Sequence, residues 1–570
     1  MDEVLHCTVW QTMTFSKRSR AWAGITVALA LIGAIGGWQL TATRPAPSQL
    51  YQRWLAAVGT QADRGAALLA FGNFGALDLD TLQTSALPWP FLATALALRE
   101  ADGHPDQVEM ATVRAALRRF GFLFPKSILG HPDLKPSDIA PLGLSIGVIE
   151  RTLPPLRVTA MTLGCAACHA GPAYRKDGTP DPEVAVLGRP NSAIDLEAFS
   201  AEGYIAVKQA LNNEPVFLNA MQRLFPDMTL RERLTLRWIA LPELRRRIVK
   251  LANGMDRPLP FRNGAPGLTN GVAALKLQLG LVSPNSFVDG AGFVSIPDLA
   301  DRNYRSALLA DGAYAPKSDT RFHRVTQAEA EARLPETLAS IASFFMVPTM
   351  GLTSERAEVA IPELTAVMAY LARARAPSFP GPIDRNRATR GKDVYAQTCA
   401  SCHGTYDDSL TSPKLLSFPN WAGNVGTDMS RAEAFTPALK AAVDKTNHGK
   451  RYLDAAATGV IAAPLLSGLW ASAPYFTNGS VPTLRHLLEP ETRPVRFMTG
   501  GHQLDLDRVG IAGVLSADGT WAYPADFVPY SKPALVDTQK PGFSNRGHDT
   551  EVRGLTADDR TNLIEYLKLL

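Results

Sequence analysis

The sequence predicts a mainly α-helical chain in which two lobes with long loops follow an N-terminal membrane segment. Three observations support this fold class. Sustained alternation of apolar and polar residues, which marks strands, is absent. The 42 prolines and 44 glycines are spread along the chain, as in long ordered loops around helices. One cysteine-histidine motif occurs twice, and a chain of 570 residues has room for two or more domains.

The composition is ordinary for a globular protein with a buried core. Hydrophobic residues make up 46% of the chain and charged residues 20%. The net charge of +4 is small, so the charge balance gives no reason to expect nucleic acid as a partner.

The N-terminus has the pattern of an export signal. Lys17, Arg18 and Arg20 precede residues 21–40, which contain no charged side chain. Positive charge before an apolar run of this length predicts insertion into the bacterial inner membrane, with the rest of the chain on the periplasmic side. We expect residues 1–45 to be this leader. The length of the run favours an uncleaved anchor, and secretion after cleavage before about Ala46 is the alternative.

Two short motifs carry the chemistry. Four of the five cysteines lie in Cys-x-x-Cys-His motifs, formed by Cys165, Cys168 and His169 and by Cys399, Cys402 and His403. At this spacing two thiols on one helical turn can bond to the vinyl groups of a haem, while the adjacent histidine binds the iron. The sequence therefore predicts two covalently bound c-type haems, one in each lobe.

Zinc binding and thiol redox chemistry are the other uses of paired cysteines. Zinc would need a second ligand pair at similar spacing, and the chain has only one further cysteine, Cys7. A thioredoxin-like pair would begin a helix in a βαβ context, which the sequence does not indicate. Haem is therefore the favoured interpretation of both motifs.

Helical patterns and turns place the first motif. The periodic spacing of apolar residues predicts helix before Gly121, which we expect to be a C-cap. Residues 187–191, after the first motif, are typical of a turn. Residues 229–252 predict a strongly basic helix with a solvated face, and docking of an acidic partner is the alternative use of that charge.

The second half of the chain contains clearer helix signals. Capping boxes begin at Thr326 and Thr556. Pro362 begins a helix to about Arg375, and the proline-rich segment after it is the best domain boundary. Residues 387–403 then predict a helix that delivers the second motif. We therefore expect a leader at 1–45, a first haem domain at 46–383 and a second cytochrome c domain at 384–570.

The C-terminal third resembles a known family. Segment 464–484 reads PLLSGLWASAPYFTNGSVPTL, and VDT at 536–538 is followed by PGFSNRGH at 541–548. On these segments the chain is similar to the di-haem c-type cytochromes related to rubber oxygenase. Those proteins in turn resemble the bacterial di-haem cytochrome c peroxidases and the di-haem enzymes that mature methylamine dehydrogenase. The resemblance extends from about residue 50 onward and is specific for the superfamily, not for a substrate.

The resemblance implies a division of labour between the haems. The second haem would be six-coordinate, with His548 as the distal ligand opposite His403. Met498 and His448 are alternative ligands, and His448 is expected at the surface. The first haem, on His169, would keep an open face where peroxide or dioxygen could bind. The resemblance also leaves open a calcium ion between the lobes.

The chain departs from the family's pattern in two places. Thr477 stands where relatives have a histidine, and residues 303–309 lack the tryptophans that relatives carry there. Tyr304 could serve in that stretch as an aromatic relay or a distal-pocket residue, although packing is the plainer interpretation. These departures argue against rubber-type dioxygenation and leave the haem assignment unchanged.

Two functions are compatible with these features. The first is an exported di-haem oxidoreductase that reacts with peroxide or dioxygen at the first haem. Its second haem would relay electrons from a redox partner protein or a quinol. The other is a membrane-tethered electron-transfer cytochrome with both haems six-coordinate and no catalytic activity. A sixth ligand on the first haem separates the two, and the candidates are His104, His131 and His323, with His323 favoured.

Overall fold

The computed structural model describes residues 60–77, 86–151, 155–251, 259–288 and 290–570. About 40% of the structure is helix and 16% is strand, so the prediction of a mainly α chain is wrong. The membrane segment predicted at 21–40 lies outside the described residues. Within those residues, no helix has both the length and the apolar character needed to cross a membrane.

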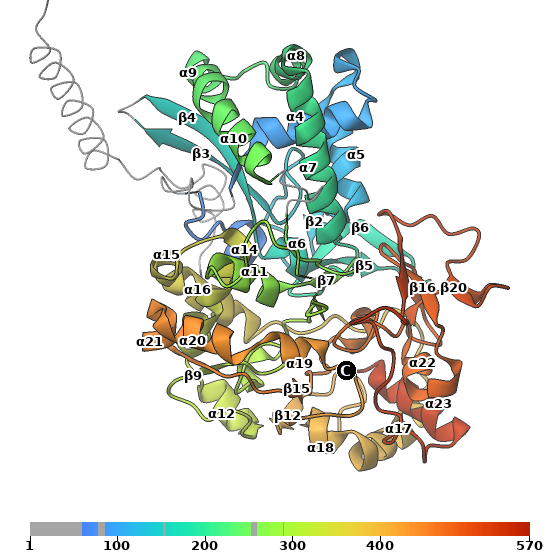
Figure 1. Cartoon of the computed structure of the whole chain (residues 1–570). Coiled ribbons are helices and arrows are strands. Elements are labelled where there is room, and N and C mark those ends of the chain that lie inside the picture. The colour runs from blue at the N-terminus through green and yellow to red at the C-terminus, as the bar shows by residue number, and fades with distance from the viewer. Residues whose placement is uncertain (1–59, 78–85, 152–154, 252–258, 289) are drawn as a thin grey trace, which may run out of the picture.

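The region around the first motif is a helical layer packed on a β-hairpin (Figure 1). Trp89 to Leu98 are all buried in the helix at its centre, as expected of a helix that is enclosed by others. The core also contains Phe120 and Phe217. The helices of this layer are α4 (Trp89–Glu100), α5 (Met110–Arg119), α7 (Leu196–Asn212), α8 (Glu214–Leu224), α9 (Leu230–Thr235) and α10 (Leu241–Leu251).

The hairpin consists of strands that the sequence pattern did not predict. β3 (Leu144–Arg151) and β4 (Leu156–Leu163) pair antiparallel over their whole length, and β1 (Leu87–Pro88) extends the sheet. Side chains along both strands do not alternate strictly between buried and exposed. Since α4 and α9 both pack against β4, the alternation typical of a half-exposed sheet is lost.

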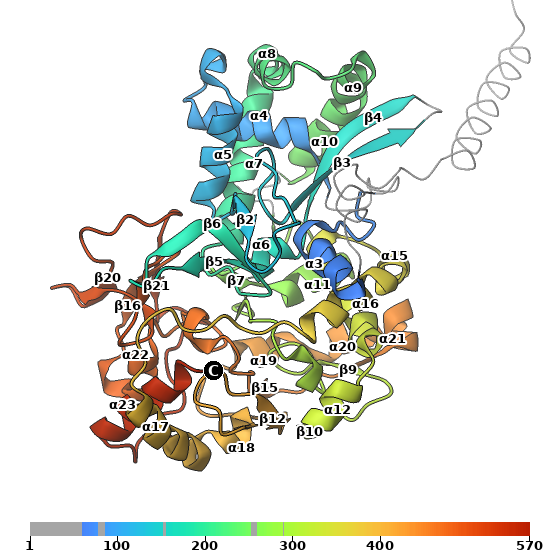
Figure 2. The ribbon, with the colours of Figure 1, turned by 180° about the vertical axis from the view of Figure 1, so that it is seen from behind.

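A second core joins residues from both halves of the chain. The helices α3 (Gln61–Phe71) and α13 (Pro335–Ala342) both pack against α16 (Ile361–Leu371) in it. Figure 2 shows α3 beside α16 from behind. Phe435, Leu439 and Val443 enter the same core. Two strand pairings cross the boundary expected near residue 384. They join β9 (Tyr314–Pro316) to β14 (Leu453–Ala455) and β10 (Val325–Thr326) to β12 (Leu415–Phe418).

The C-terminal core surrounds two closely packed helices. α17 (Arg385–Thr398) leads to the second motif, and α23 (Ala557–Leu567) packs along it. The capping boxes predicted at Thr326 and Thr556 are confirmed. A four-stranded sheet in the order β19-β20-β16-β21 lies beside them. Its strands are β16 (Arg496–Thr499), β19 (Val514–Leu515), β20 (Thr520–Ala522) and β21 (Ala534–Asp537).

Gly391 allows α17 and α23 to approach closely. A Cβ atom at this position would lie 1.9 Å from the carbonyl oxygen of Asn562. We expect Gly391→Ala to lower the free energy of unfolding by about 2–4 kcal/mol, because backbone must move to admit the methyl group. Gly271→Ala is the control, since a Cβ there meets nothing within 4 Å. Chemical denaturation measures both variants, and equal unfolding midpoints would contradict the close helix contact.

Candidate haem sites

The first motif lies on a single helical turn between two strands. α6 (Ala166–His169) follows β4 and precedes β5 (Ala170–Tyr174). The backbone N–H of His169 donates to the carbonyl of Cys165 at 2.9 Å, which closes the turn. Because residues three apart on a helical turn share a face, this geometry presents the Cys165 and Cys168 thiols together.

The turn predicted at 187–191 forms hydrogen bonds with the backbone of this motif. It follows β6 (Pro180–Leu187), the partner of β5. Gly188 N donates to the carbonyl of His169 at 2.8 Å, and Asn191 N donates to the carbonyl of Cys168 at 2.8 Å. The side-chain amide of Asn191 adds a bond to the Ala167 carbonyl at 3.1 Å. The motif backbone is thus fixed by a segment about 20 residues further along the chain.

Desolvation keeps the first motif neutral. Burial raises the pKa of the Cys165 and Cys168 thiols to about 12. Burial lowers the pKa of His169 to about 4, the Arg302 cation adds to this shift, and the backbone of Pro297 opposes it. A neutral imidazole is the form that binds a metal.

The second motif follows α17 on another one-turn helix, α18 (Ala400–His403). The predicted continuous helix over 387–403 is interrupted at Cys399, which connects α17 to α18. His403 Nδ1 lies 3.0 Å from the carbonyl oxygen of Pro464. Because a carbonyl can only accept, Nδ1 carries the proton and Nε2 is left with a free lone pair. The ring is therefore oriented to bind a metal through Nε2.

Burial also shifts the pKa values of Cys399 and His403 in the second motif. Burial raises the pKa of Cys399 to about 12. Burial also lowers the pKa of His403 to about 4; the nearby His548 lowers it further, and the Pro464 carbonyl opposes the shift. The ligand histidine of this motif is therefore also neutral near neutral pH.

His548 lies opposite His403 at the spacing that one metal ion requires. The two ring centroids are 6.2 Å apart and the ring planes differ by 24°. With a metal–imidazole bond of about 2.0 Å and about 1 Å from the nitrogen to the ring centre, two imidazoles on one metal have centroids about 6 Å apart. Nδ1 of His548 is buried without a hydrogen-bond partner among the described residues. The two histidines therefore fit one haem iron between them.

Arg493 fixes the loop that carries His548. Its guanidinium donates to the carbonyl of Asn545 at 2.7 Å and to that of Gly547 at 3.0 Å, and it pairs with Asp549 at 2.7 Å. It also lies over the Phe476 ring, which stacks on His548 with centroids 5.6 Å apart. Burial lowers the pKa of His548 to about 4, and the Arg493 cation contributes to the shift. The sequence pattern gave no indication of this positioning role for Arg493.

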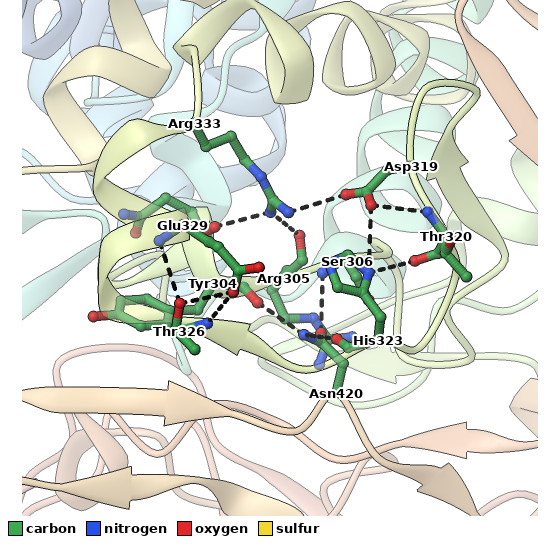
Figure 3. A network of polar contacts seen from close by, with 11 residues as sticks. Tyr304, Arg305, Ser306, Asp319, Thr320, His323, Thr326, Glu329, Arg333 and Asn420 are labelled. Carbon is green, nitrogen blue, oxygen red and sulfur yellow. Dashed lines mark hydrogen bonds and ion pairs between the residues drawn. The ribbon is translucent and has the colours of Figure 1, made fainter.

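The histidines considered for the first haem lie in other surroundings. His323 belongs to a polar network (Figure 3), where its Nδ1 lies 2.6 Å from the carbonyl of Thr320. His131 Nε2 lies 3.2 Å from the hydroxyl of Tyr370, and His104 is exposed. In the part of the chain that the structure describes, no histidine ring faces His169 as His548 faces His403.

Tyr304 connects the segment without tryptophans to the C-terminal half. Its hydroxyl is buried and donates to the carbonyl of Leu415 at 2.5 Å. Asn420 donates to the carbonyl of Tyr304 at 2.9 Å and accepts from Ser306 N at 3.0 Å, within the network of Figure 3. These contacts give Tyr304 a packing position between the two halves.

Met498 and His448, the alternative ligands for the second haem, contact other parts of the protein. Met498 lies in β16, where it pairs with Leu535 of β21. His448 is fully buried, so the expectation that it lies at the surface is wrong. Its two ring nitrogens contact the hydroxyls of Ser343 at 2.7 Å and Ser354 at 2.8 Å. Both nitrogens are satisfied by protein groups, which leaves neither free for a metal.

The described residues contain no ligand cluster for a metal ion other than haem iron. Among the residues that the structure describes, no group of three or more His, Cys, Asp or Glu side chains could hold a metal ion. The zinc alternative therefore lacks its ligand set. The calcium ion left open by the resemblance also lacks a cluster of carboxylates in these residues.

Sequence reasoning missed a buried polar cluster beside the first motif. Arg189 lies with its guanidinium carbon 4.3 Å from the ring centroid of Trp470. Asp298 and Tyr475 lie close enough to Arg189 to influence its pKa. Arg302 lowers the pKa of His169. The only sequence signal was an arginine inside the turn at 187–191, and its neighbours come from distant parts of the chain.

Comparison with known proteins identifies two stretches of the C-terminal third. Residues 386–460 match the family described as "Cytochrome C oxidase, cbb3-type, subunit III". Residues 460–498 match the family described as "RoxA-like, cytochrome c-like". The first stretch contains the second motif, and the second contains Pro464, whose carbonyl orients His403.

Two curated relatives come from Sinorhizobium fredii (strain NBRC 101917 / NGR234). "Uncharacterized protein y4iM" is 29% identical over 232 residues, which covers 34% of this chain and 50% of the relative. "Uncharacterized protein y4iJ" is 31% identical over 262 residues, which covers 34% of this chain and 41% of the relative. The chain thus spans half or less of the length of these relatives.

The motif geometry and the two family matches define the class of the protein: it is a c-type cytochrome with covalently bound haem and iron. Within this class it is related to the rubber oxygenase family. The matched cytochrome c domains support a haem-based electron-transfer or oxidoreductase function.

Proposed function

We propose that this cytochrome is a di-haem oxidoreductase that works outside the bacterial cytoplasm. The haem on Cys165 and Cys168 would meet peroxide or dioxygen, and the haem on Cys399 and Cys402 would relay electrons from a redox partner protein or a quinol. One observation carries the proposal. His403 faces His548 at 6.2 Å between centroids, whereas no described histidine ring faces His169 in this way.

The chain's own residues would determine the difference between the two centres. Pro464 orients the His403 ring, and Arg493 holds the loop of His548. Two neutral histidines held in this way would both bind the iron of the second haem, and such a centre would exchange electrons without binding a substrate. Bound haem supplies one-electron transfer, and an iron with a vacant axial position can also bind a small oxygen species.

Around the first motif, Gly188 and Asn191 bind the motif backbone, and desolvation keeps His169 neutral, as a ligand must be. Among the described residues, no second imidazole lies against His169. Unequal coordination of the two haems would favour oxidoreductase chemistry over simple electron carriage.

Spin-resonance spectra of the oxidised, haem-loaded protein test the proposal. We expect one low-spin and one high-spin signal, and cyanide should convert the high-spin signal to low-spin. After anaerobic reduction, addition of peroxide or dioxygen in separate experiments should reoxidise the protein. Two low-spin signals that do not respond to cyanide would contradict the proposal and favour an electron carrier with both haems six-coordinate.

A further inference from the structure

We propose that Arg189 and Arg302 form a buried carboxylate-binding site that takes the propionate groups of the haem at the first motif. The inference rests on the proposed function, because it requires a haem on Cys165 and Cys168. It adds to that function the residues that bind the acidic edge of the cofactor and set its charge environment.

Backbone hydrogen bonds connect both arginines to the first motif. Gly188, the residue before Arg189, donates to the carbonyl of His169 at 2.8 Å. The carbonyl of Gly188 in turn accepts from Leu299 N at 2.8 Å. Arg302 folds back to donate to the carbonyl of Asp298. The two guanidinium groups thus come from adjacent segments beside the motif.

Both arginines carry buried nitrogen atoms that have no partner. Arg189 is only 3% exposed, and its Nη2 makes no hydrogen bond with any described residue. The same holds for Nε of Arg302 and for a carboxylate oxygen of Asp298. Among the described residues, no carboxylate forms an ion pair with either guanidinium. Buried charges without a partner are costly, so an anionic ligand would relieve a real penalty.

Two other arginines with buried side chains have a carboxylate partner. Arg431, with a side chain 4% exposed, pairs with Asp311 at 2.7 Å. Arg493, also 4% exposed, pairs with Asp549 at 2.7 Å. Arg189 and Arg302 have no such ion pair with a described residue.

Asp298 lies near both guanidinium groups and Asp301 lies near Arg302, but neither carboxylate forms an ion pair with them, and Asp301 pairs with Arg375 at 3.7 Å. Arg305 is also buried, but its guanidinium donates to the carbonyls of Ala307, Leu309 and Ala463 and needs no anion. Burial lowers the pKa of Arg189 and of Arg302, and it raises the pKa of Asp298. A guanidinium presents a planar fork of donors that fits a carboxylate in bidentate fashion. Trp470 under the flat face of Arg189 leaves the edge of that fork available.

Charge-removing variants of the haem-loaded protein test this site. Arg189→Gln and Arg302→Gln should each retain two haems and shift the reduction equilibrium of the first haem at least tenfold toward the oxidised form, which is about 59 mV for one electron. Loss of a nearby cation favours the more positive ferric state. The second haem should keep its potential. Arg189→Lys retains the cation and should shift the equilibrium by less than Arg189→Gln.

Arg305→Gln is the matched control, since it removes an equally buried arginine whose nitrogens already bind carbonyls. It should leave both potentials unchanged. Unchanged potentials in haem-loaded Arg189→Gln, or an equal shift in Arg305→Gln, would overturn the inference while leaving the proposed function intact. A wild-type protein without haem on Cys165 and Cys168, found by peptide mass spectrometry, overturns the proposed function itself.

Discussion

Replacement of Cys165 and Cys168 together by alanine should remove one of the two covalently bound haems and leave the other in place. The two thiols lie on one helical turn, and they are the groups that form the thioether bonds. The absorbance of c-type haem per polypeptide should therefore fall by about half. The corresponding change at Cys399 and Cys402 should remove the other haem. Mass spectrometry under denaturing conditions measures both losses, since only covalent haem remains with the polypeptide.

Cys7→Ala is the control for this experiment, because Cys7 belongs to neither motif. It should leave the haem content unchanged. A double variant at Cys165 and Cys168 that kept two covalent haems would show that the first motif is not an attachment site.

His548→Ala should convert the low-spin haem of the second motif to a high-spin haem. His548 is the ring that faces His403 at the spacing of two ligands on one metal, and alanine offers no replacement ligand. Spin resonance should show the low-spin signal lost and a second high-spin signal gained. The variant should also bind cyanide at both haems, whereas the wild type binds it at one.

His486→Ala is a matched control from the same lobe. His486 is buried, and its ring contacts Thr483 and Trp521 instead of a motif histidine. Its removal should leave the spin states unchanged. If the low-spin signal survives in His548→Ala, His548 is not the ligand, and Met498 becomes the favoured alternative.

The local geometry of the motifs could be predicted from the sequence because it depends on neighbouring residues. The spacing of Cys165, Cys168 and His169 fixes two thiols and an imidazole on one turn without reference to the rest of the fold. Capping boxes at Thr326 and Thr556 are local in the same way, and both form as expected. The turn at 187–191 was also predictable from its glycine and proline.

Features that depend on distant partners could not be predicted in this way. His448 is buried because Ser343 and Ser354, about 100 residues earlier, bind both of its ring nitrogens. The hairpin β3–β4 lacks strict alternation because helices cover it. Arg189 gains its significance only from Trp470 and Asp298, which the fold brings to it. In each case the missing information is the identity of a neighbour that is remote in the sequence.

Mass spectrometry of the mature, denatured protein tests the central claim most directly. The account predicts a polypeptide that carries two haems, one on the peptide with Cys165 and Cys168 and the other on the peptide with Cys399 and Cys402. A polypeptide without haem, or with a single haem, would contradict it.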